Sequence, residues 1–348
     1  MGIAKTLAVR AVILCFVVIA VLLFTAVLIG ATGLSEKIYR AMMQEQLRAY
    51  RTRIAAHIHN QTELNLKVKE FEKVLIKYYG LDKPWYYRLP DMMWRIMVLD
   101  LGNARSAQTA SGSIKISDII MERLPRTILL VTTAEVIVII IGLLAGTKLS
   151  TIAGSLADRS ISLYAAFSYA LPAWWLGIIL ILVFGFYLRW FPTGGMYSTP
   201  PPPDLPHRIL DLLWHAFLPI LELVIALSGS AIYIYRSILL TTAQEDFVTV
   251  ARAKGLPENI VLKRYILRPS APPILTNIIL GLAGTIAGAI LTETVFQWPG
   301  MGLLYYEAIL SMDDRLILAL TYMFTVVYVI ARFILEVLYV VVDPRVRY

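Results

Sequence analysis

The chain of 348 residues combines a high apolar content with few charges: 58% of its residues are hydrophobic and 16% are charged. Soluble globular domains carry roughly 45–50% apolar and roughly 25% charged residues. So few charged side chains exclude an ordinary soluble protein, and the mean hydropathy of +0.68 predicts several membrane-spanning helices. The net charge of +8 does not indicate nucleic-acid binding, because membrane proteins carry basic residues in their cytoplasmic loops.

Six long apolar segments predict six transmembrane helices. The first, Ala11–Gly33, carries no charge and exceeds the roughly 7–15 residues of a signal-peptide core, so we interpret it as an uncleaved span. The other five are Thr127–Thr147, Ile161–Leu188, Ala216–Tyr235, Ile274–Thr292 and Leu316–Val342.

The basic residues of the short loops predict the orientation of these spans. With the N-terminus inside, the inner side carries twelve Lys and Arg residues and the two short outer loops carry three. The positive-inside rule therefore predicts that both termini are cytoplasmic. We expect a cytoplasmic N-terminus with the first span at 1–33, an extracytoplasmic helical loop at 34–126, and a core of five spans at 127–348.

The loop at 34–126 predicts two amphipathic helices, because apolar residues recur there at steps of three or four. The first set is Tyr39, Met43, Leu47, Tyr50, Ile54 and Ile58, and the second is Leu64, Val68, Phe71, Leu75 and Tyr78. Gly80 and Pro84 provide an end for the second helix. The hairpin either packs on the bundle or offers a docking surface to an external partner, and the sequence leaves both open.

The loop at 241–273, between the fourth and fifth spans, predicts two short helices joined by a rigid turn. Residues expected to share one face of the first helix are Phe247, Val250, Ala251 and Lys254. That helix should end at Gly255, which can adopt the left-handed conformation. Pro257 favours the start of a second helix, Glu258–Leu267, which should end before Pro269. This turn at Gly255, called the elbow below, could transmit force from the cytoplasm to the spans.

Short motifs run in order from Gly80 to the C-terminus. They read Gly80-Leu-Asp82-x-Pro84, Asp100-Leu-Gly102, Glu122-Arg-Leu-Pro125-x-Thr127, Pro172-x-Trp174-x-Leu176-Gly177, Glu245-Asp246-Phe247-(x)₃-Ala251-Arg252-Ala253-Lys254-Gly255, Arg268-Pro269, Glu293-Thr-Val-Phe296-x-Trp298-Pro299-Gly300-Met-Gly302 and Asp343-Pro344-Arg345. Together they resemble a permease subunit of ATP-binding cassette (ABC) importers, in the dipeptide/oligopeptide (peptide/nickel) branch and of the first of its two permease types. The chain departs from that pattern at residues 34–79, a helical insertion, and in having Ala251-Arg-Ala253 where the ideal triplet is Glu-Ala-Ala.

The resemblance implies an all-α fold of the type I importer permease, with six transmembrane helices, in the plasma or inner membrane of a bacterium or archaeon. It implies a second permease subunit, two ABC ATPase subunits that bind ATP and Mg, and an extracytoplasmic solute-binding protein as partners. The chain itself would hold no cofactor, metal or catalytic site, and it contains no GxxxxGK[ST] sequence that could bind ATP. The implied ATPase-coupling residues are Glu245, Asp246, Phe247, Val250, Ala251, Arg252, Ala253, Lys254 and Gly255.

Burying a charged side chain in lipid costs several kcal/mol, so polar residues in or beside the spans are seldom accidental. They are therefore candidates for lining the solute pathway. They are Glu135, Glu222, Asn277, Thr285 and Glu293. Each could instead hydrogen-bond a neighbouring helix or face the second permease. Arg332 and Glu336 lie four residues apart, which predicts a structural ion pair.

The branch that the chain resembles carries di- and oligopeptides, so we expect a peptide solute, with an oligosaccharide as the alternative. A secondary transporter is a rival class, but its inverted repeat would require a second copy of the inner-loop pattern, which the sequence lacks. An intramembrane enzyme is another rival. It would need a constellation such as HExxH or paired Asp residues on facing spans, and the sequence has neither.

Overall fold

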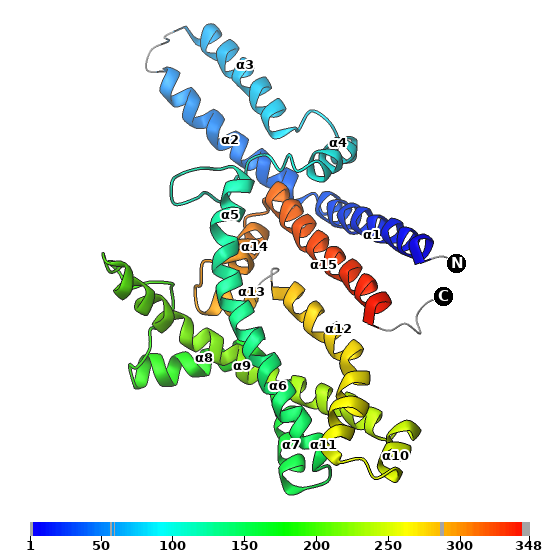
Figure 1. The fold of residues 1–348 in the computed structure, drawn as a ribbon. Coiled ribbons are helices and arrows are strands. Elements are labelled where there is room, and N and C mark those ends of the chain that lie inside the picture. Colours follow the sequence, from blue (N-terminus) through cyan, green and yellow to red (C-terminus); the bar gives the residue numbers. More distant parts are fainter. Residues whose placement is uncertain (1–2, 56–57, 59, 286–288, 343–348) are drawn as a thin grey trace. The chain divides into compact units, whose positions relative to one another are not determined.

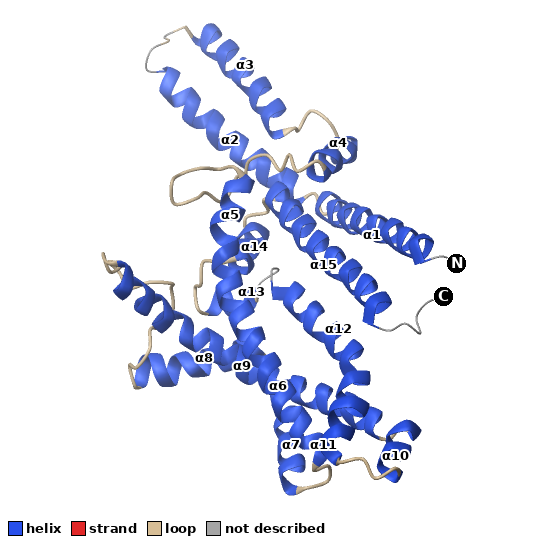
Figure 2. Cartoon of the chain, in the orientation of Figure 1, coloured by secondary structure: helices blue, strands red, loops and turns tan. Residues whose placement is uncertain are grey.

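The computed structural model describes residues 3–55, 58, 60–285 and 289–342, and these residues are almost entirely helical (Figures 1 and 2). No strand occurs among them, which confirms the predicted all-α class. The chain divides into two units. The first comprises Met1–Leu14, Ile120–Tyr306 and Val326–Tyr348, and the second comprises Cys15–Ile119 and Glu307–Thr325.

Within the described residues, five helical stretches are long and apolar enough to cross a membrane, and a bent helix pair makes a sixth if it counts as one span. The five are Leu7–Ala31, Ile116–Thr151, Leu205–Ala243, Glu258–Gly284 and Asp314–Leu338. The bent pair is Leu156–Ala170 with Ala173–Tyr187. Every predicted span overlaps one of these, although the boundaries of several differ.

The first unit is organised around α9 (Leu205–Ala243), against which α6 (Thr133–Thr151), α7 (Leu156–Ala170) and α8 (Ala173–Leu180) pack. At 1.5 Å per residue, the 39 residues of α9 extend about 58 Å, well beyond a bilayer core of roughly 30 Å. Gly142 and Gly146 let α6 approach closely, since a Cβ at Gly146 would lie 3.0 Å from the backbone nitrogen of Arg236. Upstream, α5 (Ile116–Thr127) and the π-helical η1 (Ile128–Thr132) continue into α6 as one long helix.

The third predicted span, Ile161–Leu188, is wrong as a single straight helix. It is broken into α7 and the pair α8–η2 (η2, Ile181–Tyr187), with a bend of 93°. The break falls at Leu171, whose φ of −91° and ψ of 126° are extended. Pro172 explains it, because proline disfavours the helical conformation of the preceding residue.

The fifth predicted span, Ile274–Thr292, is also corrected. α12 (Arg268–Gly284) ends well before Thr292, and a separate helix, α13 (Ile290–Val295), follows the undescribed residues 286–288. The second inner-loop helix does not stop before Pro269 either, because α11 (Glu258–Ile260) and the π-helical η3 (Val261–Leu267) continue directly into α12. A widened π turn immediately before the prolines of α12 accommodates residues that lack a backbone N–H.

Ion pairs also lie between and within helices of the first unit. The Arg236 guanidinium of α9 donates two hydrogen bonds to the carboxylate of Asp158 on α7, one of them at 2.6 Å. Arg332 and Glu336 pair at 3.7 Å on α15 (Asp314–Val342), which confirms the predicted ion pair. Glu336 also accepts a hydrogen bond from Arg10 of α1 (Ile3–Ala31) at 2.5 Å.

The second unit contains the predicted hairpin, formed by α2 (Leu34–Ala55) and α3 (Gln61–Tyr79) lying side by side (Figure 1). Its core is Tyr39, Met43, Leu47, Leu75 and Tyr79. The predicted face of the second helix is wrong at its last position, because Tyr79 is buried and Tyr78 is 65% exposed. Steps of three and of four both continue a helical face, so the pattern does not choose between them. Gly80 ends α3 with a φ of 64°, as predicted.

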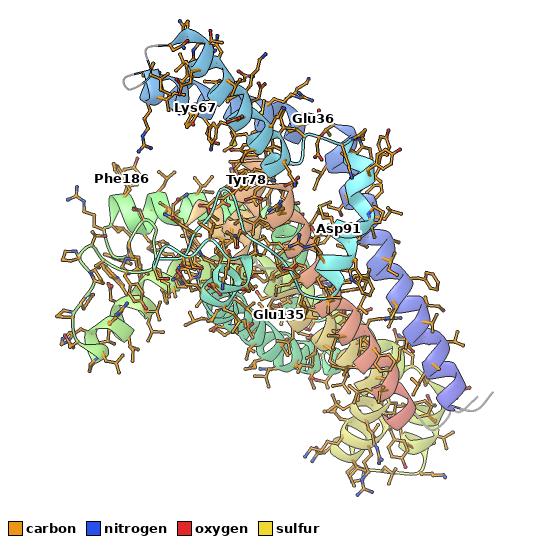
Figure 3. The ribbon with its side chains drawn as sticks, turned by 90° about the horizontal axis from the view of Figure 1, so that it is seen from above. Glu36, Lys67, Tyr78, Asp91, Glu135 and Phe186 are labelled. Atoms are coloured by element: carbon orange, nitrogen blue, oxygen red, sulfur yellow. The ribbon has the colours of Figure 1, made fainter. Side chains whose placement is uncertain are left out.

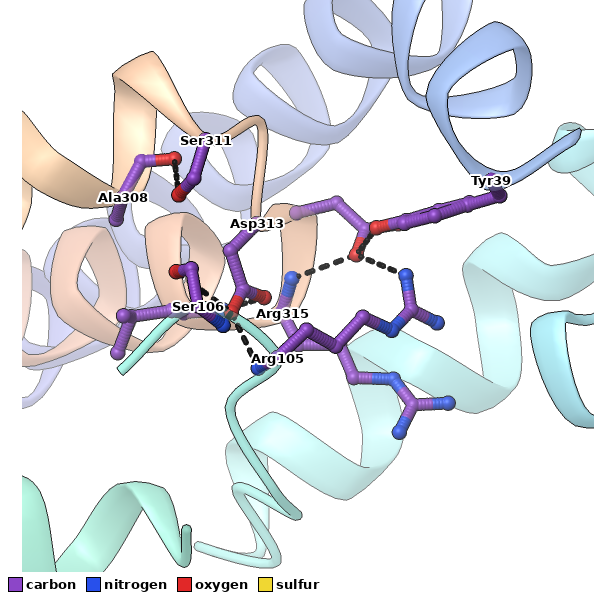
Figure 4. Close-up of polar contacts among 9 residues, drawn as sticks. Tyr39, Arg105, Ser106, Ala308, Ser311, Asp313 and Arg315 are labelled. Carbon is purple, nitrogen blue, oxygen red and sulfur yellow. Dashed lines mark hydrogen bonds and ion pairs between the residues drawn. The ribbon is translucent and has the colours of Figure 1, made fainter. Parts of the chain in front are cut away.

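A polar cluster ties α2 to the start of α15 within the second unit (Figure 4). The hydroxyl of Tyr39 donates to Asp314 at 2.5 Å, and Arg105 pairs with Asp314 at 3.3 Å while its guanidinium lies 3.8 Å from the centre of the Tyr39 ring. Asp313 accepts hydrogen bonds from the backbone nitrogens of Arg105 and Ser106 and also caps α15.

This cluster predicts an alkaline dependence of stability. Burial, reinforced by the Asp314 carboxylate, raises the pKa of the Tyr39 phenol above its usual value of about 10. The raised pKa means that the folded state holds the proton more tightly, so the stabilisation is complete below about pH 10 and is lost as pH rises above it. We expect Tyr39→Phe to have a lower melting temperature than the wild type near neutral pH. Above pH 10, the melting temperature of the variant should decrease less with rising pH than that of the wild type, as measured by thermal denaturation in detergent. An equally steep alkaline fall in both proteins would contradict this.

Candidate functional site

The segment after α9 forms a short amphipathic helix, α10 (Asp246–Ala253), with one face held against the first unit. Val248 and Ala251 are buried in a cluster with Leu239 of α9 and with Val261 and Ile266 of η3. On the neighbouring, outward-facing part of the helix, Phe247 and Val250 are 43% and 51% exposed. The helix is thus fixed to its own chain and still presents two large apolar side chains outward.

The predicted elbow is present at Gly255. Its φ is +75°, its N–H donates to the carbonyl of Arg252 at 2.9 Å, and the N–H of Leu256 donates to the carbonyl of Ala251 at 3.4 Å. This pair of bonds is the Schellman motif, which ends helices at a left-handed residue. Across the turn, Arg252 pairs with Glu258 of α11 at 2.7 Å, so side chains also brace the elbow.

A second tie links the two ends of the loop. The hydroxyl of Ser270, a fully buried residue at the start of α12, donates to the hydroxyl of Thr242 near the end of α9 at 2.8 Å. The two ends of the loop are therefore held together where α9 ends and α12 begins, so a displacement of α10 would be transmitted to both of these helices.

The nine predicted coupling residues do not form one face. Eight of them are exposed, namely Glu245, Asp246, Phe247, Val250, Arg252, Ala253, Lys254 and Gly255. Ala251 instead faces the protein together with Val248, which the sequence analysis missed. The three-residue spacing of Val248 and Ala251 was the available signal for a buried face.

Two of the pathway candidates, Glu222 and Glu293, are fully buried. Glu293 accepts hydrogen bonds from the hydroxyl of Thr127 at 2.8 Å and from the backbone N–H of Leu303 at 3.0 Å. One oxygen of Glu222 accepts from Thr292 at 3.2 Å, and the other has no hydrogen-bond partner among the described atoms. The hydrogen bonds of both carboxyl groups link neighbouring helices of the first unit. A role of Glu222 and Glu293 in the solute pathway stays a prediction.

The other three candidates lie where α12 approaches the long second span. Glu135 (labelled in Figure 3) is half-buried, and a Cβ on Gly281 would lie 2.3 Å from its carboxyl oxygen. The hydroxyls of Thr285 and Thr132 are 2.9 Å apart, and Thr285 is buried. Asn277 is exposed and donates to the carbonyl of Pro273 at 2.9 Å. The structure thus does not gather the five candidates into one exposed surface.

Taken together, the long apolar helices and the anchored inner-loop helix define a multi-pass helical membrane protein. The family model of the binding-protein-dependent transport system inner membrane component matches residues 138–348, more than half of the chain. The chain belongs to this family, whose members are membrane components of importers rather than enzymes.

Among curated proteins, the chain is similar to the oligopeptide transport system permease protein AppB of Bacillus subtilis. The two are 31% identical over 273 residues, covering 78% of this chain and 84% of AppB. It is also 30% identical to the di/tripeptide transport system permease protein DppB of Pseudomonas aeruginosa, covering 77% and 83% of the two chains. The oligopeptide transport system permease protein OppB of Haemophilus influenzae is 28% identical, over 67% of this chain and 72% of OppB.

Proposed function

We propose that this chain is a transmembrane subunit of an ATP-driven importer of di- or oligopeptides. A second permease subunit completes the solute pathway, an extracytoplasmic binding protein delivers the solute, and two ATPase subunits bind ATP and Mg on the cytoplasmic side. In this proposal both termini and α10 are cytoplasmic, as the distribution of basic residues favours.

The observation that carries this function is the exposed face of α10. Phe247 and Val250 are large apolar side chains that stay exposed, while the helix is already anchored by the buried Val248 and Ala251, so these two side chains are free to contact a partner. Exposed aromatic side chains on a rigid element are typical anchors of protein interfaces. Glu245 and Asp246 at the start of the helix disfavour the alternative that α10 lies on anionic lipid headgroups.

The peptide solute is supported by the relatives AppB, DppB and OppB, which are named as oligopeptide and di/tripeptide permeases. No described feature of this chain favours an oligosaccharide.

The double variant Phe247→Asp/Val250→Asp tests this function in proteoliposomes that contain the whole transporter. We expect ATP-driven peptide uptake to fall at least tenfold, because two charges would be buried against the ATPase, with normal amounts of the chain in the membrane. Val74→Asp on α3 is the matched control, since Val74 is 60% exposed and lies outside α10, and it should retain uptake.

The isolated chain provides the second arm of this experiment. Reconstituted alone, it should neither take up peptide nor hydrolyse ATP. Solute uptake by the pure chain, or normal uptake by the double variant in the full transporter, would overturn the proposal.

A further inference from the structure

Helix α4 (Trp85–Met97), which the sequence analysis did not predict, lies beside membrane-embedded parts of two spans. The hydroxyl of Tyr322 donates to the carbonyl of Met97 at 3.3 Å. Tyr322 is eight residues beyond Asp314, where α15 begins, and therefore about 12 Å along that helix. Ile96 belongs to the same packed cluster as Leu22 of α1. The C-terminal half of α4 therefore packs against α1 and α15 within the lengths of these two candidate spans.

The exposed residues of α4 and of the turn that follows are mixed in character. The large apolar and aromatic ones are Tyr86, Tyr87, Trp94, Val98 and Leu99. The charged ones are Asp91, Arg95 and Asp100, of which Arg95 and Asp100 form an ion pair at 2.8 Å. Trp94 is 64% exposed and Leu99 is 68% exposed. Trp and Tyr prefer the boundary between hydrocarbon and headgroups, and an exposed ion pair such as Arg95–Asp100 also suits that boundary. The exposed aromatic side chains of α4 are therefore suited to contact with lipid at this level.

A cavity of about 420 Å³ opens next to α4, at the ends of α1 and α15. Apolar residues from three helices contribute to its lining, namely Ala26, Ile29, Ile96 and Leu318. Trp85 forms part of the wall and rests directly on α1, since a Cβ on Gly30 would lie 2.2 Å from its ring. Figure 3 labels Glu36, Tyr78 and Asp91, which come from α2, α3 and α4 and also line the cavity.

Most acidic residues of the cavity lining have an ion-pair partner, whereas several of its basic residues have none among the described side chains. Three acidic residues are already engaged in ion pairs: Glu36 with Arg40 at 2.7 Å, Asp100 with Arg95 at 2.8 Å, and Asp314 with Arg105 at 3.3 Å. The lining cations Lys77, Lys83 and Arg315 form no ion pair with the described side chains, and Asp91 is the acid that remains to balance them. The cavity thus combines an apolar part, lined by residues of two candidate spans and α4, with an excess of cations that have no ion-pair partner among the described side chains.

We propose that this cavity binds the headgroup of an anionic phospholipid. The phosphate contacts Lys77, Lys83 and Arg315, and the acyl chains lie along the exposed face of α4. A free anion would leave the apolar lining unused, and a zwitterionic lipid would bring its own ammonium group to a site with excess cations. The proposal concerns the second unit alone and does not depend on the proposed transport function.

Native mass spectrometry of the transporter tests the site, with equal amounts of phosphatidylglycerol and phosphatidylcholine added in detergent. The wild-type protein should retain phosphatidylglycerol at least fivefold over phosphatidylcholine. Lys83→Gln/Arg315→Gln should bring the ratio close to one. Lys67→Gln/Lys69→Gln makes the same charge change on α3 outside the cavity and should keep the wild-type preference. Arg315→Lys, which preserves the charge, should also keep it.

Several results would overturn the proposal. One is an unchanged preference in Lys83→Gln/Arg315→Gln with a normal melting temperature, and another is a wild-type protein that retains both lipids equally. Displacement of phosphatidylglycerol by millimolar inorganic phosphate would assign the cavity to a free anion. Displacement by a tripeptide would assign it to a solute.

Discussion

Gly255→Pro is expected to reduce peptide uptake at least tenfold while membrane insertion stays normal. Proline fixes φ near −65°, whereas Gly255 has a φ of +75°, and proline also removes the N–H that donates to the Arg252 carbonyl. The elbow would have to open, and α10 would no longer be held at the angle that Val248 and Ala251 fix. Uptake and ATP hydrolysis by the reconstituted transporter are the measurements, and hydrolysis should lose its dependence on the solute.

Two other substitutions at Gly255 separate the elbow from general instability. A Cβ there meets no atom within 4 Å, so Gly255→Ala adds only the strain of a left-handed conformation, about 1–2 kcal/mol. Gly255→Asn should be closest to wild type, because asparagine tolerates that conformation. Uptake should fall in the order Asn, Ala, Pro, and equal uptake by Gly255→Pro and wild type would show that the elbow does not transmit force.

Glu293→Ala is expected to have the largest effect on stability in the first unit. Glu293 is fully buried, and its removal would leave the hydroxyl of Thr127 and the N–H of Leu303 without their acceptor and would open a cavity. Buried polar groups left unpaired in this way cost about 3 kcal/mol in total. Glu293→Gln keeps one acceptor oxygen and should lose about 1 kcal/mol. Thermal denaturation in detergent should place both variants below wild type, with Ala lowest.

Gly300→Ala tests the same hydrogen bonds in a second way, because Gly300 lies beside Glu293 and Thr127. A Cβ on Gly300 would lie 2.4 Å from both the Glu293 carboxyl oxygen and the Thr127 hydroxyl, so it should separate the two groups without removing either. A melting temperature of Glu293→Ala equal to that of the wild type would show that these bonds do not stabilise the fold.

The local features of this protein could be predicted from its sequence. Hydropathy located the spans, and glycines with left-handed backbones ended helices where expected, at Gly80 and Gly255. These signals depend on neighbouring residues only. The break at Pro172 is also a local effect, because proline disfavours the helical conformation of Leu171, but the charge-free run across it resembles that of one continuous span.

The contacts between distant segments could not be predicted in this way. Tyr39 and Asp314 are 275 residues apart, and Thr127 and Glu293 are 166 apart, so no periodic pattern relates them. Each of these carboxylates looked like an isolated polar residue in the sequence. Val248 was missed for a related reason, because the buried side of a helix of eight residues depends on which neighbours cover it.

Site-specific photocrosslinking from Phe247 tests the central claim most directly. Benzoylphenylalanine at Phe247 in the assembled transporter should give a crosslinked product with an ATPase subunit, and the same probe at Val74 of α3 should give none. If Phe247 crosslinks to lipid alone, or if both positions capture the ATPase equally, α10 is not the contact through which a partner drives this permease.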